Sequence, residues 1–491
     1  MQVSKFSGFR LFYLAPALAL IALTAWSFAS PMGSSPDDDF HLASIWCAGG
    51  AKPGECKLGT ENNNRYVPEA LHYAPCFAMR PTESAKCQTE FDLNSNAMVL
   101  TDRGSFANNY PPMYYSAMNL FVGSNILASV LVMRIINALL FVGVTWLLYW
   151  LLPIERRSTL IWAWLITTVP LGLFLIASNN PSAWALIGVG SAWLALLGYF
   201  ESSGRRKVAL GAIFAATAIM AAGSRGDAGI YVVLSVIAVG ILTFRRDKGY
   251  FVSAILPLIM SAIAILFFLS SQQSSVVSSG LGSGTGSAAA GQLTGFALIA
   301  YNLLSVQSLW TGAFGGAGLG WLDTTMPAIV EVSAVATFVA VAFVGLSRTS
   351  WRKTLVVVAA ALTLWILPTY VLVKGGNVVP ENVQPRYLLP LIVVFAGLAM
   401  FSVAKARLKF SRIQVVFIIL SLSIAQAVAL QINMRRYITG IDKQGWNLDA
   451  NIEWWWDIPF SPMFVWIVGS VAFAALVTVT VRELTRTHEL A

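Results

Sequence analysis

Residues 11–41, LFYLAPALALIALTAWSFASPMGSSPDDDFH, join a long apolar stretch to a run of three acids. Residues 11–30 suffice for one membrane crossing, since a spanning helix needs about 20 apolar residues. The stretch is longer than the apolar part of a typical signal peptide, so we expect it to be retained. Asp37, Asp38 and Asp39 repel one another unless a cation lies nearby. The stretch therefore predicts an anchor followed by a solvated acidic turn or by a reactive site at the membrane surface.

The remaining chain has the composition of a polytopic membrane protein. Hydrophobic residues make up 57% of the 491 residues and charged residues only 11%, and the mean hydropathy is +0.68. These values are far from those of soluble domains, so we expect an all-α polytopic fold. Hydropathy predicts about twelve membrane helices, near residues 11–30, 116–151, 158–178, 183–200, 208–224, 228–244, 249–269, 326–347, 354–373, 388–404, 413–433 and 462–481.

Cationic side chains predict the orientation. If Lys5 and Arg10 are cytoplasmic, most Lys and Arg residues of the short connections fall on the same side of the membrane. Cytoplasmic loops carry this excess, so we expect a multi-pass protein of the cell membrane with both termini in the cytoplasm. The net charge of +9 then reflects topology. Because the cations are spread over many loops, no nucleic-acid partner is indicated.

The first outer loop, predicted at residues 31–115, contains all four cysteines: Cys47, Cys56, Cys76 and Cys87. Outside the cell an even number of cysteines predicts disulfides, although four cysteines allow three connectivities. We prefer the sequential pairs Cys47–Cys56 and Cys76–Cys87, because they close the shortest loops. A zinc site is the alternative, disfavoured because no CxxC pair occurs.

The predicted cytoplasmic side lacks the features of a nucleotide-dependent enzyme. Its connections are short, and no GxxxxGK[ST] phosphate loop occurs. Polar groups gather instead on the predicted outer side, which favours a reaction or a binding event there. A second outer loop, residues 270–293, is rich in Ser, Gly and Ala, and we expect a flexible linker or a lid that orders over substrate.

Several of these polar groups also have a purely structural interpretation. Arg386 is either a snorkelling residue at a helix end or a functional cation. Arg225 and Asp227 are able to form a local ion pair. The Trp454–Trp456 run is either an interfacial anchor or a sugar-stacking platform. Arg134, inside an apolar span, is either structural or a contact to a lipid phosphate.

Three short motifs, in order along the chain, resemble those of a bacterial family of polytopic membrane proteins. They are Pro36-Asp37-Asp38 followed by His41, then Tyr110-Pro111-Pro112-Met113-Tyr114-Tyr115, then Arg386-Tyr387-Leu388-Leu389-Pro390. The family's usual forms are Pro-Asp-Glu-x-x-His, Pro-Pro-Leu-Tyr-Tyr and Arg-Tyr-x-x-Pro. This chain has Asp38 in place of Glu and Met113 in place of Leu. The family looks like part of the GT-C superfamily of integral-membrane glycosyltransferases, which includes protein O-mannosyltransferases and lipid A aminoarabinose transferases.

The resemblance implies a single GT-C-like domain over residues 1–491. It also implies transfer of a sugar from a polyprenyl-phosphate donor to a hydroxyl of a glycan, lipid or protein acceptor at the outer membrane face. Asp37 or Asp38 would be the general base, and better-understood relatives favour the first acid of the pair. Arg386 would stabilise the departing lipid phosphate. The side chains expected to contact substrate are His41, Tyr110, Tyr114, Arg225, Arg386 and Tyr387. No cofactor is expected, and a divalent metal is possible but not indicated.

Two other classes fit parts of the pattern. A secondary transporter or a flippase of lipid-linked precursors has a similar number of helices. Such proteins usually carry ionisable groups at mid-membrane and repeated halves, and the sequence shows neither feature beyond Arg134. A non-catalytic receptor or scaffold would explain the cysteine-bearing loop, but it has no use for Arg386. The transferase hypothesis alone requires Asp37 or Asp38 to meet Arg386 in space.

Overall fold

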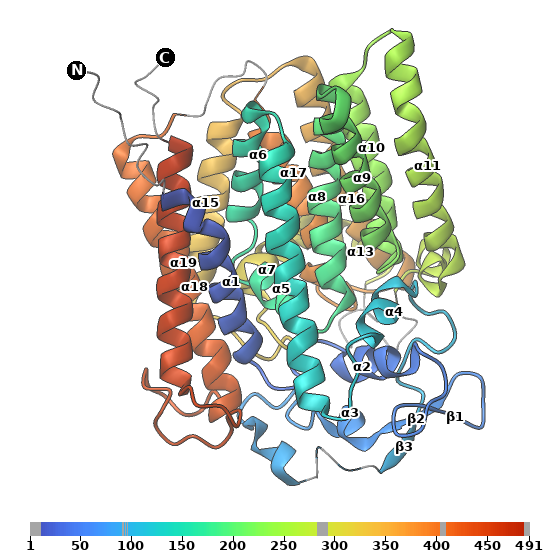
Figure 1. Cartoon of the computed structure of the whole chain (residues 1–491), viewed down its shortest axis with the longest axis vertical. Coiled ribbons are helices and arrows are strands. Elements are labelled where there is room, and N and C mark those ends of the chain that lie inside the picture. The colour runs from blue at the N-terminus through green and yellow to red at the C-terminus, as the bar shows by residue number, and fades with distance from the viewer. Residues whose placement is uncertain are drawn as a thin grey trace.

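The computed structural model describes residues 11–90, 93, 95, 97–281, 293–402 and 409–485. Long helices form a bundle, and short helices and strands cover one of its ends (Figure 1). Among these residues, nine helices are long and apolar enough to cross a membrane. They are α1 (Ala15–Phe28, preceded by the 3-10 turn Leu11–Leu14), α5 (Ile126–Leu151), α8 (Pro181–Glu201), α10 (Gly226–Thr243), α11 (Lys248–Ser270), α15 (Ala328–Gly345), α16 (Trp351–Gly375), α18 (Arg412–Ile438) and α19 (Pro462–Thr485).

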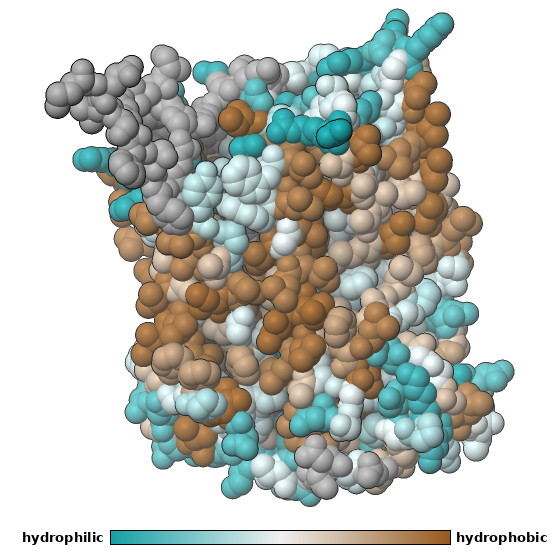
Figure 2. All heavy atoms as spheres, viewed as in Figure 1, coloured by the Kyte–Doolittle hydropathy of each residue, from teal (hydrophilic) through white to brown (hydrophobic). Residues whose placement is uncertain are grey.

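The surface of the bundle has the polarity of a membrane protein. Hydrophobic residues cover the flank of the molecule, and hydrophilic residues gather toward its two ends (Figure 2). Large apolar side chains on the membrane helices, such as Leu258 on α11 and Phe343 on α15, are exposed. Exposed apolar surface of this extent would not be stable in water. The chain is therefore a multi-pass membrane protein.

One predicted span, residues 158–178, is a broken segment. It consists of α6 (Ile154–Leu165) and α7 (Leu171–Ile176), with an irregular turn between them. Thr167 and Thr168 donate hydroxyl hydrogen bonds to the carbonyls of Ala163 and Trp164. The turn is buried by protein, which is the environment in which irregular backbone is tolerated at membrane depth.

Two further predicted spans are helical but fall short of a typical membrane helix. Residues 208–224 belong to α9 (Gly204–Ala222), which begins with Arg205, Arg206 and Lys207, and residues 388–404 belong to the 16-residue α17 (Pro385–Met400). Neither is among the nine full-length candidates in the described chain, so the predicted count of about twelve is not confirmed. The three cations at its start set α9 apart from the nine candidates, and its length of 16 residues sets α17 apart.

The centre of the bundle is formed by α8 and α17. Gly397 on α17 lies against Trp193 of α8, and a Cβ atom at Gly397 would come within 2.1 Å of the indole ring. Small residues let membrane helices approach this closely. At one end of the bundle, Arg156 of α6 pairs with Glu201 of α8 at 2.7 Å and donates to the Ser402 carbonyl beyond α17. We call this the far end; the start of α1 and the end of α19 also lie there (Figure 1).

The opposite end carries a cap, which we define as residues 31–125. It contains α2 (Asp38–Cys47), β1 (Lys57–Leu58), β2 (Arg65–Pro68), α3 (Glu69–Tyr73), the 3-10 turn Ala85–Glu90, β3 (Met98–Thr101) and α4 (Met113–Asn119). The strands form an antiparallel sheet in the order β1-β2-β3. The helical prediction therefore holds for the bundle but missed this sheet. The predicted span 116–151 also begins later, at Ile126, because Asn125 caps α5 by accepting from the backbone N–H of Ala128 at 2.9 Å.

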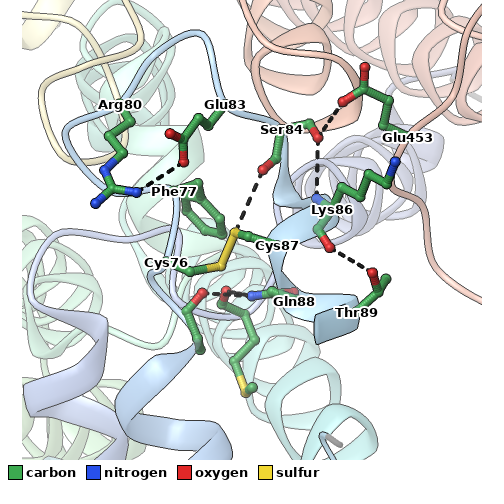
Figure 3. The surroundings of a disulfide bond; sticks show 12 residues. Cys76, Phe77, Arg80, Glu83, Ser84, Lys86, Cys87, Gln88, Thr89 and Glu453 are labelled. Carbon is green, nitrogen blue, oxygen red and sulfur yellow. Dashed lines mark hydrogen bonds and ion pairs between the residues drawn. A yellow bond between two sulfur atoms is a disulfide. The ribbon is translucent and has the colours of Figure 1, made fainter. Parts of the chain in front are cut away.

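The cysteines form the two predicted sequential disulfides, Cys47–Cys56 and Cys76–Cys87. Around Cys76–Cys87, the Gln88 side chain donates to the carbonyls of Met32 and Ala74, and Ser84 donates to Glu453 from the α18–α19 connection (Figure 3). Residues 76–88, which we call the arm, are thus hydrogen-bonded both to the start of the cap and to the connection between α18 and α19.

The predicted loop 270–293 begins with structure. Gln272–Ser275 form a 3-10 turn and α12 spans Val276–Ser279. Gln272 bonds through its backbone and side chain to the carbonyls of Asn108 and Ala107 in the cap. Residues 282–292 lie outside the described residues, so the flexibility of the loop stays a prediction. After it come α13 (Gly295–Ser305), α14 (Gln307–Thr311) and a π-helical turn at Gly312–Gly316.

Candidate functional site

The site is built on the turn that follows α1. Arg134 of α5, almost fully buried, donates to the carbonyls of Ser27, Ser30 and Pro31 at 3.0, 2.6 and 2.8 Å. Ser27 is in the last turn of α1, whose carbonyls the helix leaves free, and Ser30 and Pro31 follow the helix directly; a cation at this end is favourable. Arg134 therefore has the structural role of the two considered: it fixes the chain between α1 and the Asp run.

Asp38 closes this turn from within. Its carboxylate accepts the backbone N–H of Gly33 at 2.9 Å and the Ser35 hydroxyl at 3.1 Å. Burial raises the pKa of Asp38 to about 6, although the positive charge of Arg134 and these hydrogen bonds oppose the rise. Asp38 has no exposed surface, so it cannot contact substrate directly in this arrangement.

Asp37 has the opposite orientation. It precedes α2 with a left-handed backbone, φ 59°, a conformation uncommon for any residue but glycine and more frequent for Asp and Asn. Its side chain is 35% exposed and lies 2.8 Å from Arg386 and 3.3 Å from Arg103. Burial alone would raise the pKa of Asp37, but the charges of Arg386 and Arg103 outweigh it, and the pKa is lowered. Asp37 is thus an ionised, accessible carboxylate at neutral pH.

Arg386 comes directly after Pro385, the first residue of α17. Its Nη2 donates to Asp37 at 2.8 Å and to the Tyr387 hydroxyl at 3.3 Å. Its Nε and Nη1 are buried and have no hydrogen-bond partner among the described residues. A buried guanidinium with free N–H groups is costly unless an acceptor occupies them. Arg386 therefore has donors to spare for an anion.

Arg225 adds a second cation next to Arg386. It forms a bidentate pair with Asp227 at 2.9 and 2.7 Å, so the local ion pair considered from the sequence is present. Its guanidinium also lies 4.5 Å from the ring centre of Tyr387 and 5.7 Å from that of Tyr110. The two arginines thus share the Tyr387 ring.

A cavity of about 250 Å³ opens beside this cluster. Its walls are apolar side chains of α10, α11, α16 and α17, and its polar lining includes Tyr110, Arg225, Asp227 and Tyr387. Tyr387 connects it to the Asp37–Arg386 pair, because its ring lines the cavity and its hydroxyl accepts from Arg386. Its shape and chemistry suit a ligand with an apolar chain and an anionic head.

His41 lies behind Tyr110 with its ring edge-on to the tyrosine. Its Nδ1 is 2.9 Å from the Tyr115 hydroxyl, and its buried Nε2 has no partner in the described part of the chain. Burial, helped by the charges of the neighbouring arginines, lowers the pKa of His41 to about 3. The imidazole is therefore neutral at physiological pH and able to form one further hydrogen bond.

The remaining predicted residues differ in position. Tyr114 is buried against Trp184 and is not among the residues that line the cavity. Trp454 and Trp456 pack with Phe77 and Tyr437 beneath the cap, which makes these two part of a core, and Trp455 is partly buried beside them.

The structure thus brings Asp37 and Arg386 together across 349 residues of sequence, with Tyr110, Arg225 and Tyr387 next to them. Sequence reasoning missed Arg103, which pairs with Asp39 at 2.8 Å as well as with Asp37, and Tyr115, which orients His41. Arg103 follows β3 in a polar loop, and no motif distinguishes it there. Within the described ranges, no three His, Cys, Asp or Glu side chains form a group that could hold a metal ion.

A family model described as "Predicted membrane protein (DUF2142)" matches residues 20–395. The matched range runs from α1 into α17, so it contains the cap, Asp37 and Arg386. No curated protein and no solved structure matches the chain.

Proposed function

The chain belongs to the DUF2142 family of membrane proteins, and from its site we propose that it is a glycosyltransferase of the GT-C type. It transfers a sugar from a polyprenyl phosphate to a hydroxyl of a glycan, lipid or protein acceptor. The reaction takes place at the cap end, which in this proposal faces the outside of the cell. One observation carries the proposal: the exposed carboxylate of Asp37 lies 2.8 Å from Arg386, beside an apolar cavity.

The cavity supports a lipid-linked donor. Its apolar walls come from helices of the membrane bundle, and its polar end is formed by Arg225 and Tyr387. An isoprenoid chain would occupy the apolar part while its phosphate lies near the two arginines. A soluble nucleotide sugar would gain nothing from such walls, since a nucleotide is polar along its length.

Asp37 would be the general base. The acceptor hydroxyl oxygen attacks the anomeric carbon, the bond from that carbon to the phosphate oxygen breaks, and Asp37 takes the hydroxyl proton. Because its pKa is lowered, Asp37 is ionised at neutral pH, which is the form that a general base requires, although the same shift makes it a weaker base. Asp38, buried and bonded to Gly33 and Ser35, would act only by holding the turn.

Arg386 and Arg225 would stabilise the leaving group. A phosphodiester carries one negative charge, and the polyprenyl phosphate that departs carries up to two, so charge develops on the phosphate during the reaction. The Nε and Nη1 of Arg386 are buried and have no partner among the residues that the structure describes; once a phosphate displaces their neighbours, the planar guanidinium suits its oxygens. Electrostatic stabilisation of this kind is usually the largest single catalytic contribution.

The test uses two of the three adjacent acids, Asp37 and Asp39, as matched variants. Transfer from a synthetic polyprenyl-phosphate sugar is measured for the wild type, Asp37→Asn and Asp39→Asn in the same membrane preparation. We expect Asp37→Asn to lose transfer, by about 10²–10⁴-fold as for other general bases, and Asp39→Asn to keep most of it. Full transfer in Asp37→Asn would refute the proposed base. A flippase would instead move the lipid across the bilayer equally well in both variants, which a leaflet-exposure assay would reveal.

A further inference from the structure

The far end of the bundle has a second, larger cavity of about 750 Å³, formed by the ends of three helices. It is lined by the end of α10, the segment leading into α11 and the start of α16. The lining residues with charged or aromatic side chains are Phe244, Arg246, Tyr250, Trp351 and Arg352. Nothing in the candidate site uses this cavity, because Asp37 and Arg386 lie in the cap and at the cap end of α17.

The cations of this cavity differ in how they are held. Arg352 donates through Nη1 to the Phe244 carbonyl at 3.1 Å and lies 5.6 Å from the ring centre of Trp351, so its guanidinium has a fixed position. Arg246 is exposed and has no hydrogen-bond or ion-pair partner within the described ranges. Asp247, the nearest acid in sequence, is occupied in capping α11, where it accepts from the backbone N–H of Tyr250 at 2.8 Å. The local charge is therefore positive.

The apolar side of the cavity continues onto the flank of the bundle. Ile237, Ile241 and Leu355 line its walls. Beyond them, α11 and α16 expose large apolar side chains such as Phe251 and Val358. A molecule held at Arg246 and Arg352 would therefore have an apolar surface along which acyl chains could lie.

We propose that this cavity binds one anionic phospholipid of the surrounding membrane. Its phosphate lies between Arg246 and Arg352, the aromatic rings of Trp351 and Tyr250 contact the headgroup region, and its acyl chains follow α11 and α16. Charge complementarity selects this occupant. Two arginines lie beside one acid, Asp247, which caps α11, so the site favours a lipid with net negative charge. Aromatic rings at the interface level provide the usual anchoring environment. The inference is independent of the proposed transferase activity, since no catalytic residue contributes to it.

The test measures lipid binding to the detergent-solubilised full chain. Native mass spectrometry and thermal unfolding are recorded with phosphatidylglycerol, with phosphatidylcholine and with inorganic phosphate. We expect phosphatidylglycerol to remain bound and to raise the Tm, and the other two to do neither. Arg246→Gln with Arg352→Gln should weaken phosphatidylglycerol binding about tenfold or more, because both charge-assisted contacts are lost.

A matched control separates a specific site from general attraction to cations. Arg205→Gln with Arg206→Gln removes two exposed cations from the start of α9, at the same end but outside the cavity, and should leave phosphatidylglycerol binding unchanged. Arg352→Gln removes a hydrogen bond to the Phe244 carbonyl and could disturb the end of α10. Arg246→Gln alone avoids this problem, because Arg246 has no partner among the described residues, and phosphatidylglycerol binding to it should also be weakened. Equal loss of binding in the control pair, or unchanged binding in Arg246→Gln with Arg352→Gln, would overturn the proposal.

Discussion

Two of the arginine–aspartate pairs at the cap end of the bundle have different surroundings. In the pair Asp37–Arg386, the carboxylate is 35% exposed and the arginine keeps two nitrogens without partners in the described chain. In the pair Asp323–Arg436, the side chains are only 6% and 0% exposed. Arg436 also donates to the carbonyls of Phe77 and Glu83. The first pair is open toward a ligand, and the second is closed by the protein itself.

The difference shows how one ion pair can serve two purposes. A buried pair whose arginine uses both Nη1 and Nη2 on protein acceptors holds segments together, here the cap, the segment that contains Asp323, and α18. A pair with unused donors beside a cavity stabilises little by itself, but it is prepared for a negatively charged ligand. The following predictions test this distinction.

The largest expected effect is on stability, from the closed pair. Asp323→Asn leaves the charge of Arg436 buried without its counter-ion, so we expect a loss of about 3–5 kcal/mol of unfolding free energy. The measurement is reversible unfolding in mild detergent. Asp323→Leu with Arg436→Met should recover part of the loss, since removing both charges leaves none unpaired. A stability equal to that of the wild type in Asp323→Asn would show that the closed pair holds nothing.

The open pair should respond in activity instead. Arg386→Ala should reduce transfer by about 10²–10³-fold, equivalent to about 3–4 kcal/mol of transition-state stabilisation, and Arg386→Lys should fall between this variant and the wild type because it lacks the planar fork. The measurement is kcat/KM with a synthetic polyprenyl-phosphate sugar. Lys443→Ala, an exposed cation that pairs with Asp442, is the control. If Lys served as well as Arg at position 386, the snorkelling interpretation would be correct.

A smaller effect concerns the pH dependence of stability that arises from Asp38, the buried neighbour of Asp37 in the sequence. The pKa of Asp38 is about 6 in the folded protein, against an ordinary value of 3.8. A raised pKa favours the protonated folded state, so this contribution is full below about pH 4 and is lost as the pH rises through 6. The change amounts to at most about 3 kcal/mol. Unfolding measured from pH 4 to pH 7 should show the decline, and Asp38→Asn should remove it while Asp323→Asn keeps it.

The smallest expected effect separates the two disulfides. Both close short loops, of 9 and 11 residues, so the chain-entropy contribution of each is similar, about 2–3 kcal/mol. Only Cys76–Cys87 brackets Phe77 and Glu83, whose carbonyls accept from Arg436. Cys76→Ser with Cys87→Ser should therefore cost about 1 kcal/mol more than Cys47→Ser with Cys56→Ser, the worth of one hydrogen bond. An equal loss of unfolding free energy in the two variants would show that the carbonyls of Phe77 and Glu83 keep their contacts with Arg436 when the Cys76–Cys87 disulfide is absent.

The membrane helices were predictable from sequence, because length and hydropathy are enough to identify them. Nine of the expected spans are long apolar helices in the described chain, because length and hydropathy are sufficient for a helix that faces lipid. The break between α6 and α7 was not predictable in this way. Its backbone is stable because surrounding helices bury it and because Thr167 and Thr168 bond to preceding carbonyls, which are tertiary properties.

The candidate site shows the same division. Asp37 and Arg386 were expected to meet because motifs at both ends of the chain suggested it, and they do meet. The residues alone did not distinguish Asp37 from Asp38. The difference arises in the folded turn, where Asp38 bonds to Gly33 and Ser35 and Asp37 stays accessible. Arg103 was missed because a single cation in a polar loop has no periodicity or spacing that marks it.

The closed pair also has a consequence for how the protein is made. Ribosomes deliver the cap early and Arg436 near the end of synthesis, so the carbonyls of Phe77 and Glu83 emerge several hundred residues before the guanidinium that they bind. Until α18 is inserted, this arm lacks the hydrogen bonds from Arg436. Insertion of α18 is thus the step of biogenesis that completes the contacts of the first outer loop. A chain shortened before α18 would have a cap without the hydrogen bonds that Arg436 donates to it.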